Sequence, residues 1–159
     1  MRPVLRPITP SDEPFLRRVY ASTRAEELAA VPWTAEQKDA FVAHQFAAQS
    51  AHYAQHYTGL SGHVVLVDGH PAGRLLVARW EHEIRIVDIA LLPEFRGGGT
   101  GRFLLDRLVA EADDAGKVLS IHVERQNPAL RLYERLGFRA VADEGVYLRL
   151  ERCQLKIAS

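Results

Sequence analysis

The sequence predicts a mixed α/β protein whose central sheet is covered by helices on both faces. Apolar runs of strand length alternate with longer runs of helical periodicity, and glycine-containing turns separate them. The chain has 159 residues, 47% of them hydrophobic, which is enough for one ordinary folded domain with a sizeable core. We therefore expect a single domain over residues 1–159.

The composition narrows the classes of function. Twenty basic and 20 acidic residues cancel, which argues against a nucleic-acid-binding surface or an electrostatic membrane anchor. No segment approaches the roughly 18 consecutive apolar residues of a membrane span, and residues 1–10 lack the apolar core of a signal peptide. Cys153 is the single cysteine, so no intrachain disulfide can form. We expect a cytoplasmic protein with neither nucleic acid nor membrane as a partner.

The N-terminal third predicts one strand and two helices. A strand over residues 4–8 belongs at a sheet edge, because the prolines in and beside it cannot donate to a central ladder. Residues 9–12 have helix-start chemistry, and apolar residues recur behind them at helical spacing. Thr34 and Gln37 form a capping box for a second helix that is expected to end near Tyr57.

Strands dominate the next segment. Residues 63–67 and 72–78 flank Asp68-Gly69, a strong signal for a hairpin turn, and residues 84–92 follow as a third strand. A helix is then expected from about residue 101 to 115, closed by the C-terminal cap Gly116. The remaining elements are a strand over 119–123, a helix over 128–137 that Pro128 opens, and a hairpin of strands over 138–141 and 146–150.

A glycine-rich loop lies between the third of these strands and the helix that follows it. Glycines there let backbone N–H groups converge, and the helix start adds unpaired donors and partial positive charge, so the loop suits a phosphorylated ligand. It is neither a P-loop, because no Lys-Ser or Lys-Thr follows, nor a dinucleotide fingerprint, which would need glycine at Arg102. Arg102 can alternatively be a solvent-exposed side chain with no contact to the ligand. The candidate residues are Arg96, Gly97, Gly98, Gly99, Thr100, Gly101 and Arg102.

Two segments together resemble a known superfamily. Arg96-x-x-Gly99-x-Gly101 resembles motif A of the GNAT N-acetyltransferases, and the run from Asn127 to Phe138 resembles the second signature of that superfamily, in the same order and at similar spacing. The resemblance covers roughly residues 64–150, and residues 153–159 are expected to form a C-terminal tail. It implies a mixed, mostly antiparallel sheet of about six or seven strands, flanked by about four helices. The resemblance also implies a bulge in the strand that ends at Leu92, which splays from the strand over 119–123 at the cofactor site.

The resemblance implies acetyl-CoA as cosubstrate, with its diphosphate on the glycine-loop amides. The pantetheine arm would then pair with exposed backbone at Leu91 and Leu92, where a free N–H can polarise the thioester carbonyl. Asn127 is a candidate cofactor contact or a plain helix cap. Charge-assisted hydrogen bonds of about 1.5–3 kcal/mol each outweigh the helix dipole at about 0.3–1 kcal/mol, so the amides should dominate.

The same resemblance suggests catalytic residues. Tyr133 is the candidate general acid for the departing thiolate, with a core aromatic as the alternative. Asp88 and Glu83 are candidate bases for the acceptor ammonium. They stand five positions apart, so strand alternation places them on opposite faces unless a bulge intervenes. Asp88 can instead bond loop backbone, and a base acting through ordered water, or His122, is a further alternative.

We expect no metal, because His52 and His56 lack the glutamate of the zinc-protease pattern and an evident third ligand. The leading hypothesis is direct transfer of acetyl to a primary amine of a small molecule or peptide, in a ternary complex. The alternatives are a non-catalytic acyl-CoA sensor on the same fold and a protein N-terminal or lysine acetyltransferase. Homodimers are frequent in the superfamily, although the sequence indicates no interface.

Overall fold

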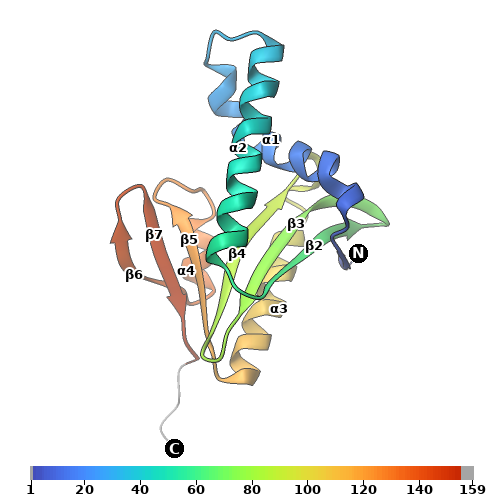
Figure 1. Cartoon of the computed structure of the whole chain (residues 1–159). Helices are drawn as coiled ribbons and strands as arrows, with labels where there is room; N and C mark the ends of the chain where they lie inside the picture. Colours follow the sequence, from blue (N-terminus) through green and yellow to red (C-terminus); the bar gives the residue numbers. More distant parts are fainter. Residues whose placement is uncertain (1, 155–159) are drawn as a thin grey trace, which may run out of the picture.

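The computed structural model describes residues 2–154, in which seven strands form one sheet of order β1-β2-β3-β4-β5-β7-β6 (Figure 1). All neighbours pair antiparallel except β4 and β5, which run parallel. The strands are β1 (Val4–Pro7), β2 (Leu60–Val67), β3 (His70–Arg79), β4 (Glu83–Leu91), β5 (Val118–Glu124), β6 (Arg139–Glu144) and β7 (Tyr147–Arg152). This is the predicted mixed, mostly antiparallel α/β class.

Helices cover both faces of the sheet. Figure 1 shows α1 and α2 on one face, and α3 with α4 on the other. The main core lies between the sheet and α3, and a smaller cluster of Leu16, Tyr20 and Phe46 joins α1 to α2. In residues 2–154 no helix is both long enough and apolar enough to cross a bilayer. The helices are α1 (Glu13–Ala29), α2 (Ala35–His56), α3 (Thr100–Ala115) and α4 (Leu130–Arg135), with short 3-10 turns η1 (Pro10–Asp12) and η2 (Pro93–Phe95).

Local signals in the sequence locate several turns and caps correctly. Asp68 and Gly69 both have positive φ, 53° and 79°, as a tight hairpin turn requires. Thr34 accepts from the Gln37 amide at 3.1 Å while the Gln37 side chain accepts from the Thr34 amide at 2.9 Å. Gly116 caps α3 in the left-handed conformation.

The helix expected over residues 128–137 is shorter than predicted, because α4 begins only at Leu130. The Asn127 side chain accepts from the Ala129 amide at 2.8 Å, and the Leu130 amide donates to the Asn127 carbonyl at 3.1 Å. These bonds close a tight turn over the Asn-Pro segment, so Pro128 lies in the turn and not in the helix.

The sheet parts between β4 and β5. Their parallel pairing runs only from Glu83 beside Val118 to Ile86 beside Ile121. Immediately beyond this point the β3–β4 register shifts, because Val77 faces Ile86 while the preceding residue of β3 faces Asp88. Val87 is therefore an extra residue, a β-bulge that turns the second half of β4 away from β5.

The backbones of β3 and β4 approach so closely at Gly73 that only glycine fits at this position. A Cβ built at Gly73 would lie 2.1 Å from the Ala90 carbonyl oxygen of β4 and 3.0 Å from the Leu91 Cα, both of them backbone atoms that cannot rotate away. Only glycine lets β3 and the bulged half of β4 pair at this distance.

We therefore expect Gly73→Ala to lower the free energy of unfolding by at least about 2 kcal/mol, because two strands must separate to admit the methyl group. Urea unfolding followed by circular dichroism measures the loss. The control is Gly98→Ala, whose Cβ meets no atom within 4 Å and should change stability by less than about 0.5 kcal/mol. Equal effects of the two substitutions would contradict the close-approach argument.

Candidate active site

The glycine loop ends at an open helix N-terminus. Gly97 and Gly99 adopt φ of 81° and 86°, and Gly99 is the N-cap of α3. The first intrahelical bond runs from the Phe103 amide to the Gly99 carbonyl at 2.9 Å, so the amides of residues 100–102 have no partner within the helix. A Cβ at Gly97, Gly98, Gly99 or Gly101 would meet no atom within 4 Å. The loop thus offers exposed amides around open space, which fits a diphosphate.

The two arginines beside this loop are engaged elsewhere. Arg96 donates from Nε to the Leu91 carbonyl at 2.9 Å and reaches Ser22 of α1 at 3.5 Å. Arg102 pairs with Asp106 one helical turn away at 3.1 Å, with both side chains about half exposed. Both arginines border the loop, and their contact with phosphate remains a prediction.

The end of β4 differs in part from expectation. The Leu92 amide donates to the Ala72 carbonyl of β3 at 2.8 Å, so the free amide expected at Leu92 is not found there. Successive amides of a strand point to opposite edges, so the Leu91 amide points away from β3 toward the parted side. Of the two residues, Leu91 is the one whose backbone faces the opening.

Tyr133 of α4 belongs to the main core cluster and is 5% exposed. The Phe138 amide donates to the Tyr133 carbonyl at 3.0 Å and the two rings meet edge to face at 5.6 Å, which fixes the α4 terminus. Burial, and secondarily the charge of Asp88, raises the pKa of Tyr133 to about 12. The phenol therefore keeps its proton at neutral pH, as a proton donor must.

Asp88 lies at the mouth of the opening in a partly buried ion pair. Arg74 of β3 donates to Asp88 Oδ2 from Nε at 2.8 Å and from Nη2 at 2.5 Å, and Nη2 also reaches Gln49 of α2 at 3.0 Å. Arg74 is only 5% exposed, whereas the Asp88 side chain is 23% exposed. No role for Arg74 is predicted from the sequence. A lone arginine in the apolar run 72–78 does indicate a buried charge that needs a partner, so the sequence contained a signal for it.

Glu83 shares the face of Asp88, because the bulge at Val87 reverses the alternation between them. Its carboxylate accepts from Arg85 at 2.8 Å and from Ser120 at 2.5 Å, in the half of the sheet where β4 and β5 are still paired. The geometry thus separates Glu83 from the opening, so the two carboxylates do not meet at one site.

His122 of β5 continues this network toward the opening. Arg85 donates from Nη1 to Nδ1 of His122 at 3.2 Å, and Nε2 lies 3.4 Å from the carboxylate of Glu144. An arginine can only donate, so the imidazole carries its proton on Nε2. Burial first, and then the positive charge of Arg85, lowers the pKa of His122 below its ordinary value. The ring is therefore neutral at pH 7.

A cavity of about 430 Å³ lies beside the bulge at Val87, His122 and Glu144. Its walls come from α2, from β4 at the bulge, from β5 and from the β6–β7 hairpin. Tyr57 stacks on Trp80 and packs edge to face on Tyr53, so much of one wall is aromatic. The lining residues are Gln49, His52, Tyr53, Tyr57, Ile86, Val87, His122, Glu144 and Tyr147.

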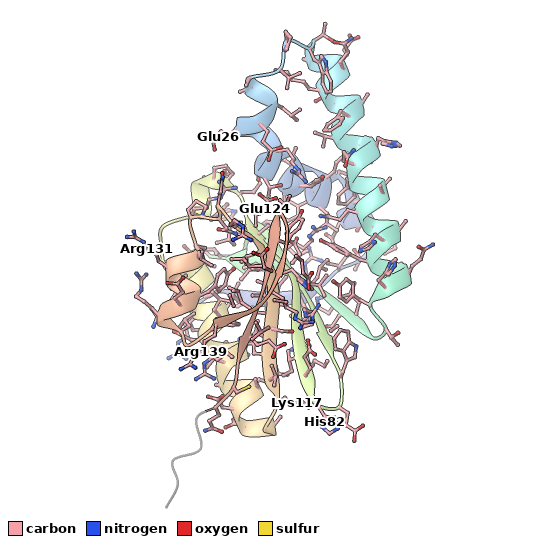
Figure 2. The ribbon with its side chains drawn as sticks, turned by 90° about the vertical axis from the view of Figure 1, so that its left-hand side faces the viewer. Glu26, His82, Lys117, Glu124, Arg131 and Arg139 are labelled. Atoms are coloured by element: carbon pink, nitrogen blue, oxygen red, sulfur yellow. The ribbon has the colours of Figure 1, made fainter. Side chains whose placement is uncertain are left out.

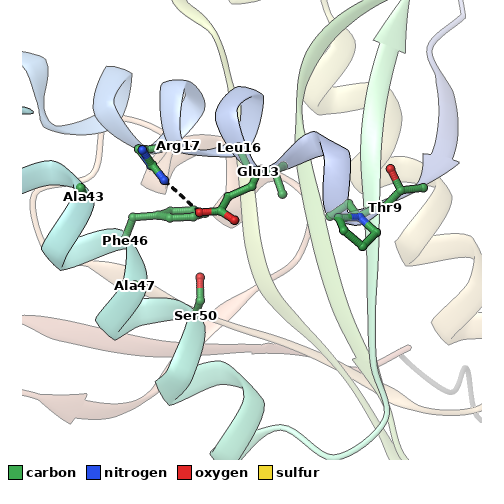
Figure 3. A pocket seen from close by; sticks show the side chains of 10 residues that line it. Thr9, Glu13, Leu16, Arg17, Ala43, Phe46, Ala47 and Ser50 are labelled. Carbon is green, nitrogen blue, oxygen red and sulfur yellow. Dashed lines mark hydrogen bonds and ion pairs between the residues drawn. The ribbon is translucent and has the colours of Figure 1, made fainter.

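A larger cavity of about 660 Å³ lies between the start of α1 and the opposite side of α2 (Figure 3). Phe46, Ala43 and Ala47 line it, and the exposed Glu13–Arg17 ion pair spans its rim at 2.8 Å. It contains neither a residue of the glycine loop nor one from the parted strands. We therefore place the candidate site in the smaller cavity.

The imidazole rings of His52 and His56 stack with their centroids 4.1 Å apart, and His56 Nδ1 lies 2.9 Å from the His52 carbonyl oxygen. Within residues 2–154 no three His, Cys, Asp or Glu side chains form a group that could hold a metal ion.

We expect Asp88→Ala to cost about 3 kcal/mol of unfolding free energy, because it leaves the buried Arg74 guanidinium without its counter-ion. Asp88→Asn, which keeps an oxygen acceptor, should cost less. The matched control is Asp106→Ala, which breaks the exposed pair with Arg102 and should cost under about 0.5 kcal/mol. Chemical denaturation of the three variants measures this order, and an equal loss for Asp88→Ala and Asp106→Ala would contradict it.

Comparison with known proteins supports this arrangement. The sequence profile of the Acetyltransferase (GNAT) family matches residues 16–138. The structure is similar to PaiA N-acetyltransferase of Thermoplasma acidophilum in complex with coenzyme A, with a TM-score of 0.71, 15% identity, and coverage of 97% of this chain and 100% of that one. It is also similar to an acetyltransferase of Thermus thermophilus, with a TM-score of 0.69, 22% identity, and coverage of 97% and 98%.

Two curated relatives match shorter segments. The [ribosomal protein bS18]-alanine N-acetyltransferase of Haemophilus influenzae is 37% identical over 60 residues, which span 37% of this chain and 41% of the relative. The L-amino acid N-acyltransferase MnaT of Escherichia coli is 48% identical over 52 residues, or 31% and 30% of the two chains. The matches thus span less than half of either relative. From the match to most of the chain and the shared fold, the protein belongs to the GNAT acetyltransferase family.

Proposed function

We propose that this protein is an acetyl-CoA-dependent N-acetyltransferase that transfers acetyl directly to a primary amine in a ternary complex. The observation that carries the proposal is the open glycine loop at the start of α3, beside the parted strands β4 and β5. Family membership supports the transferase class. The names of the two curated relatives describe an alanine of ribosomal protein bS18 and L-amino acids as acceptors, which supports an amine acceptor here.

In this proposal the cofactor is held mainly by backbone. The amides of residues 97–102 bind the diphosphate, with Arg96 and Arg102 supplying charge after release from their present partners. The Leu91 backbone and the Asn127 amide group contact the pantetheine arm. Arg96 must leave the Leu91 carbonyl for this, since its Nε now donates to that oxygen at 2.9 Å.

The cofactor supplies an activated acetyl thioester. The protein supplies the proton for the departing thiolate and accepts the proton of the acceptor ammonium. Tyr133 protonates the departing thiolate from its buried phenol. Both Arg74 bonds go to Oδ2 of Asp88, so Oδ1 is the oxygen that receives the acceptor ammonium and its proton. Glu83 acts on none of the reacting atoms, and anchors Arg85 and Ser120 instead.

The loop assignment predicts the effect of one added charge. Gly98→Asp should weaken acetyl-CoA binding more than tenfold, because a carboxylate would then face the diphosphate among the loop amides. Gly98→Asn has nearly the same shape without the charge, and should bind within about threefold of wild type. Isothermal titration calorimetry with acetyl-CoA measures both. Equal affinities for the two variants, or no binding by wild type at millimolar cofactor, would reject the assignment.

The acid assignment predicts that Tyr133→Phe lowers kcat by about 100-fold or more while the Kd for acetyl-CoA changes little, because only the proton donor is removed. Thiol release with a panel of primary amines gives kcat. An unchanged kcat would remove Tyr133 from the mechanism. Wild-type protein that binds acetyl-CoA yet releases no thiol with any amine would instead be an acyl-CoA sensor.

A further inference from the structure

The 430 Å³ cavity carries its formal charge on one side only. Among its lining residues in the described part of the chain, Glu144 is the only Asp, Glu, Lys or Arg. The Glu144 side chain is 47% exposed and lies at the end of β6, on the wall opposite β4. Any charge preference of this cavity should therefore come largely from one carboxylate.

Charged groups behind the walls are paired with one another. Arg74 holds Asp88 at 2.5 Å, and Arg85 holds Glu83 at 2.8 Å. On β7, Arg149 lies 3.6 Å from Glu151. Each of these arginines has a carboxylate other than Glu144 within 4 Å, although the buried Nε of Arg149 donates to no acceptor, so none of them is paired with Glu144.

The neighbour of Glu144 does not neutralise it either. His122 receives the Arg85 donor on Nδ1 and faces Glu144 with Nε2–H. This neutral imidazole, whose pKa is lowered by burial and by Arg85, brings no counter-charge to the carboxylate. The chain Glu83–Arg85–His122 thus holds the imidazole with its Nε2 toward Glu144.

The remaining walls also favour a cation. Tyr53 and Tyr57 line the cavity from α2, and Tyr147 lines it from β7. Aromatic faces attract ammonium groups, and a carboxylate beside them adds to that attraction. Figure 2 shows Glu26 on α1 in the projecting part of the molecule, whereas Arg131 and Arg139 lie on the side away from α2.

The reacting nitrogen belongs at the other wall. Asp88 follows Val87 of the cavity lining, and Arg74 ties it to the lining residue Gln49. An acceptor whose amine reaches Asp88 at the parted strands therefore extends its far end toward Glu144. We propose that Glu144 binds a second cationic group of the acceptor, so that the preferred substrates are diamines and other amines carrying a second positive charge. This inference rests on the proposed acetyltransferase function.

Three acceptors of similar length test the inference. Putrescine ends in a second ammonium, pentylamine ends in a methyl group and 5-aminopentanoate ends in a carboxylate. At saturating acetyl-CoA, kcat/KM from thiol release should favour putrescine over pentylamine about tenfold, with 5-aminopentanoate the poorest. In Glu144→Gln the putrescine-to-pentylamine ratio should fall to about 1. A wild-type enzyme that prefers pentylamine, or a ratio that Glu144→Gln leaves intact, would overturn the proposal.

The matched control is Asp143→Asn, which removes one negative charge from the same strand. Asp143 points to the other face, where it pairs with Arg125, so its loss should leave the acceptor ratio unchanged. Thermal unfolding checks that both variants fold, and the wild-type ratio tests the proposal without any variant.

Calorimetry of putrescine with coenzyme A-saturated protein separates the two proposals, because no acetyl can be transferred. A Kd that weakens about tenfold in Glu144→Gln, without turnover of any amine, supports the subsite and rejects the acetyltransferase. Turnover of amines without a preference for a second positive charge supports the acetyltransferase and rejects the Glu144 subsite.

Discussion

The interaction that the rest of the site depends on is the interrupted pairing of β4 with β5. Four residues of each strand pair in parallel, and the bulge at Val87 then turns β4 aside. Without the extra residue, Asp88 would point into the core side of the sheet, where a carboxylate has no place among apolar neighbours. The bulge therefore opens the sheet and also brings Asp88 to the face that α2 covers, beside Arg74.

The buried Arg74–Asp88 pair links three elements that are distant in sequence. Arg74 comes from β3, Asp88 from β4 and Gln49 from α2, and one guanidinium bonds the side chains of the other two. Burying an arginine is costly unless its donors are satisfied, so this contact also ties the middle of α2 to the sheet. The position of the aromatic wall that α2 contributes thus depends on an ion pair outside the cavity lining.

The features predictable from sequence are those whose cause is local. The Asp68-Gly69 turn, the Thr34 capping box and the Gly116 cap each depend on residues within about four positions, and each is confirmed. The start of α4 lies two residues later than the sequence predicts, because the Asn127 side chain competes with the helix for the Ala129 amide.

The features that were not predictable depend on register and topology. The resemblance implies a bulge in the strand that ends at Leu92, but a valine does not mark position 87 as the place of that bulge, and the partnership of Arg74 with Asp88 follows only from the pairing of β3 with β4. Glu144 reaches His122 because β7 inserts between β5 and β6, an order that neither strand indicates by itself. The glycine loop is predicted from its own residues, and Tyr133 and Asp88 are predicted with the help of the family resemblance, whereas the charge of the cavity becomes visible only in three dimensions.

The position of Arg96 has a consequence for the protein before any ligand arrives. The parted half of β4 is an internal strand edge, and such edges can recruit strands from other chains. By capping the Leu91 carbonyl with a charged, solvated guanidinium, Arg96 places a deterrent to self-association at the point where the sheet is least protected. With Arg96 in place, this edge offers one acceptor fewer to a strand from another molecule.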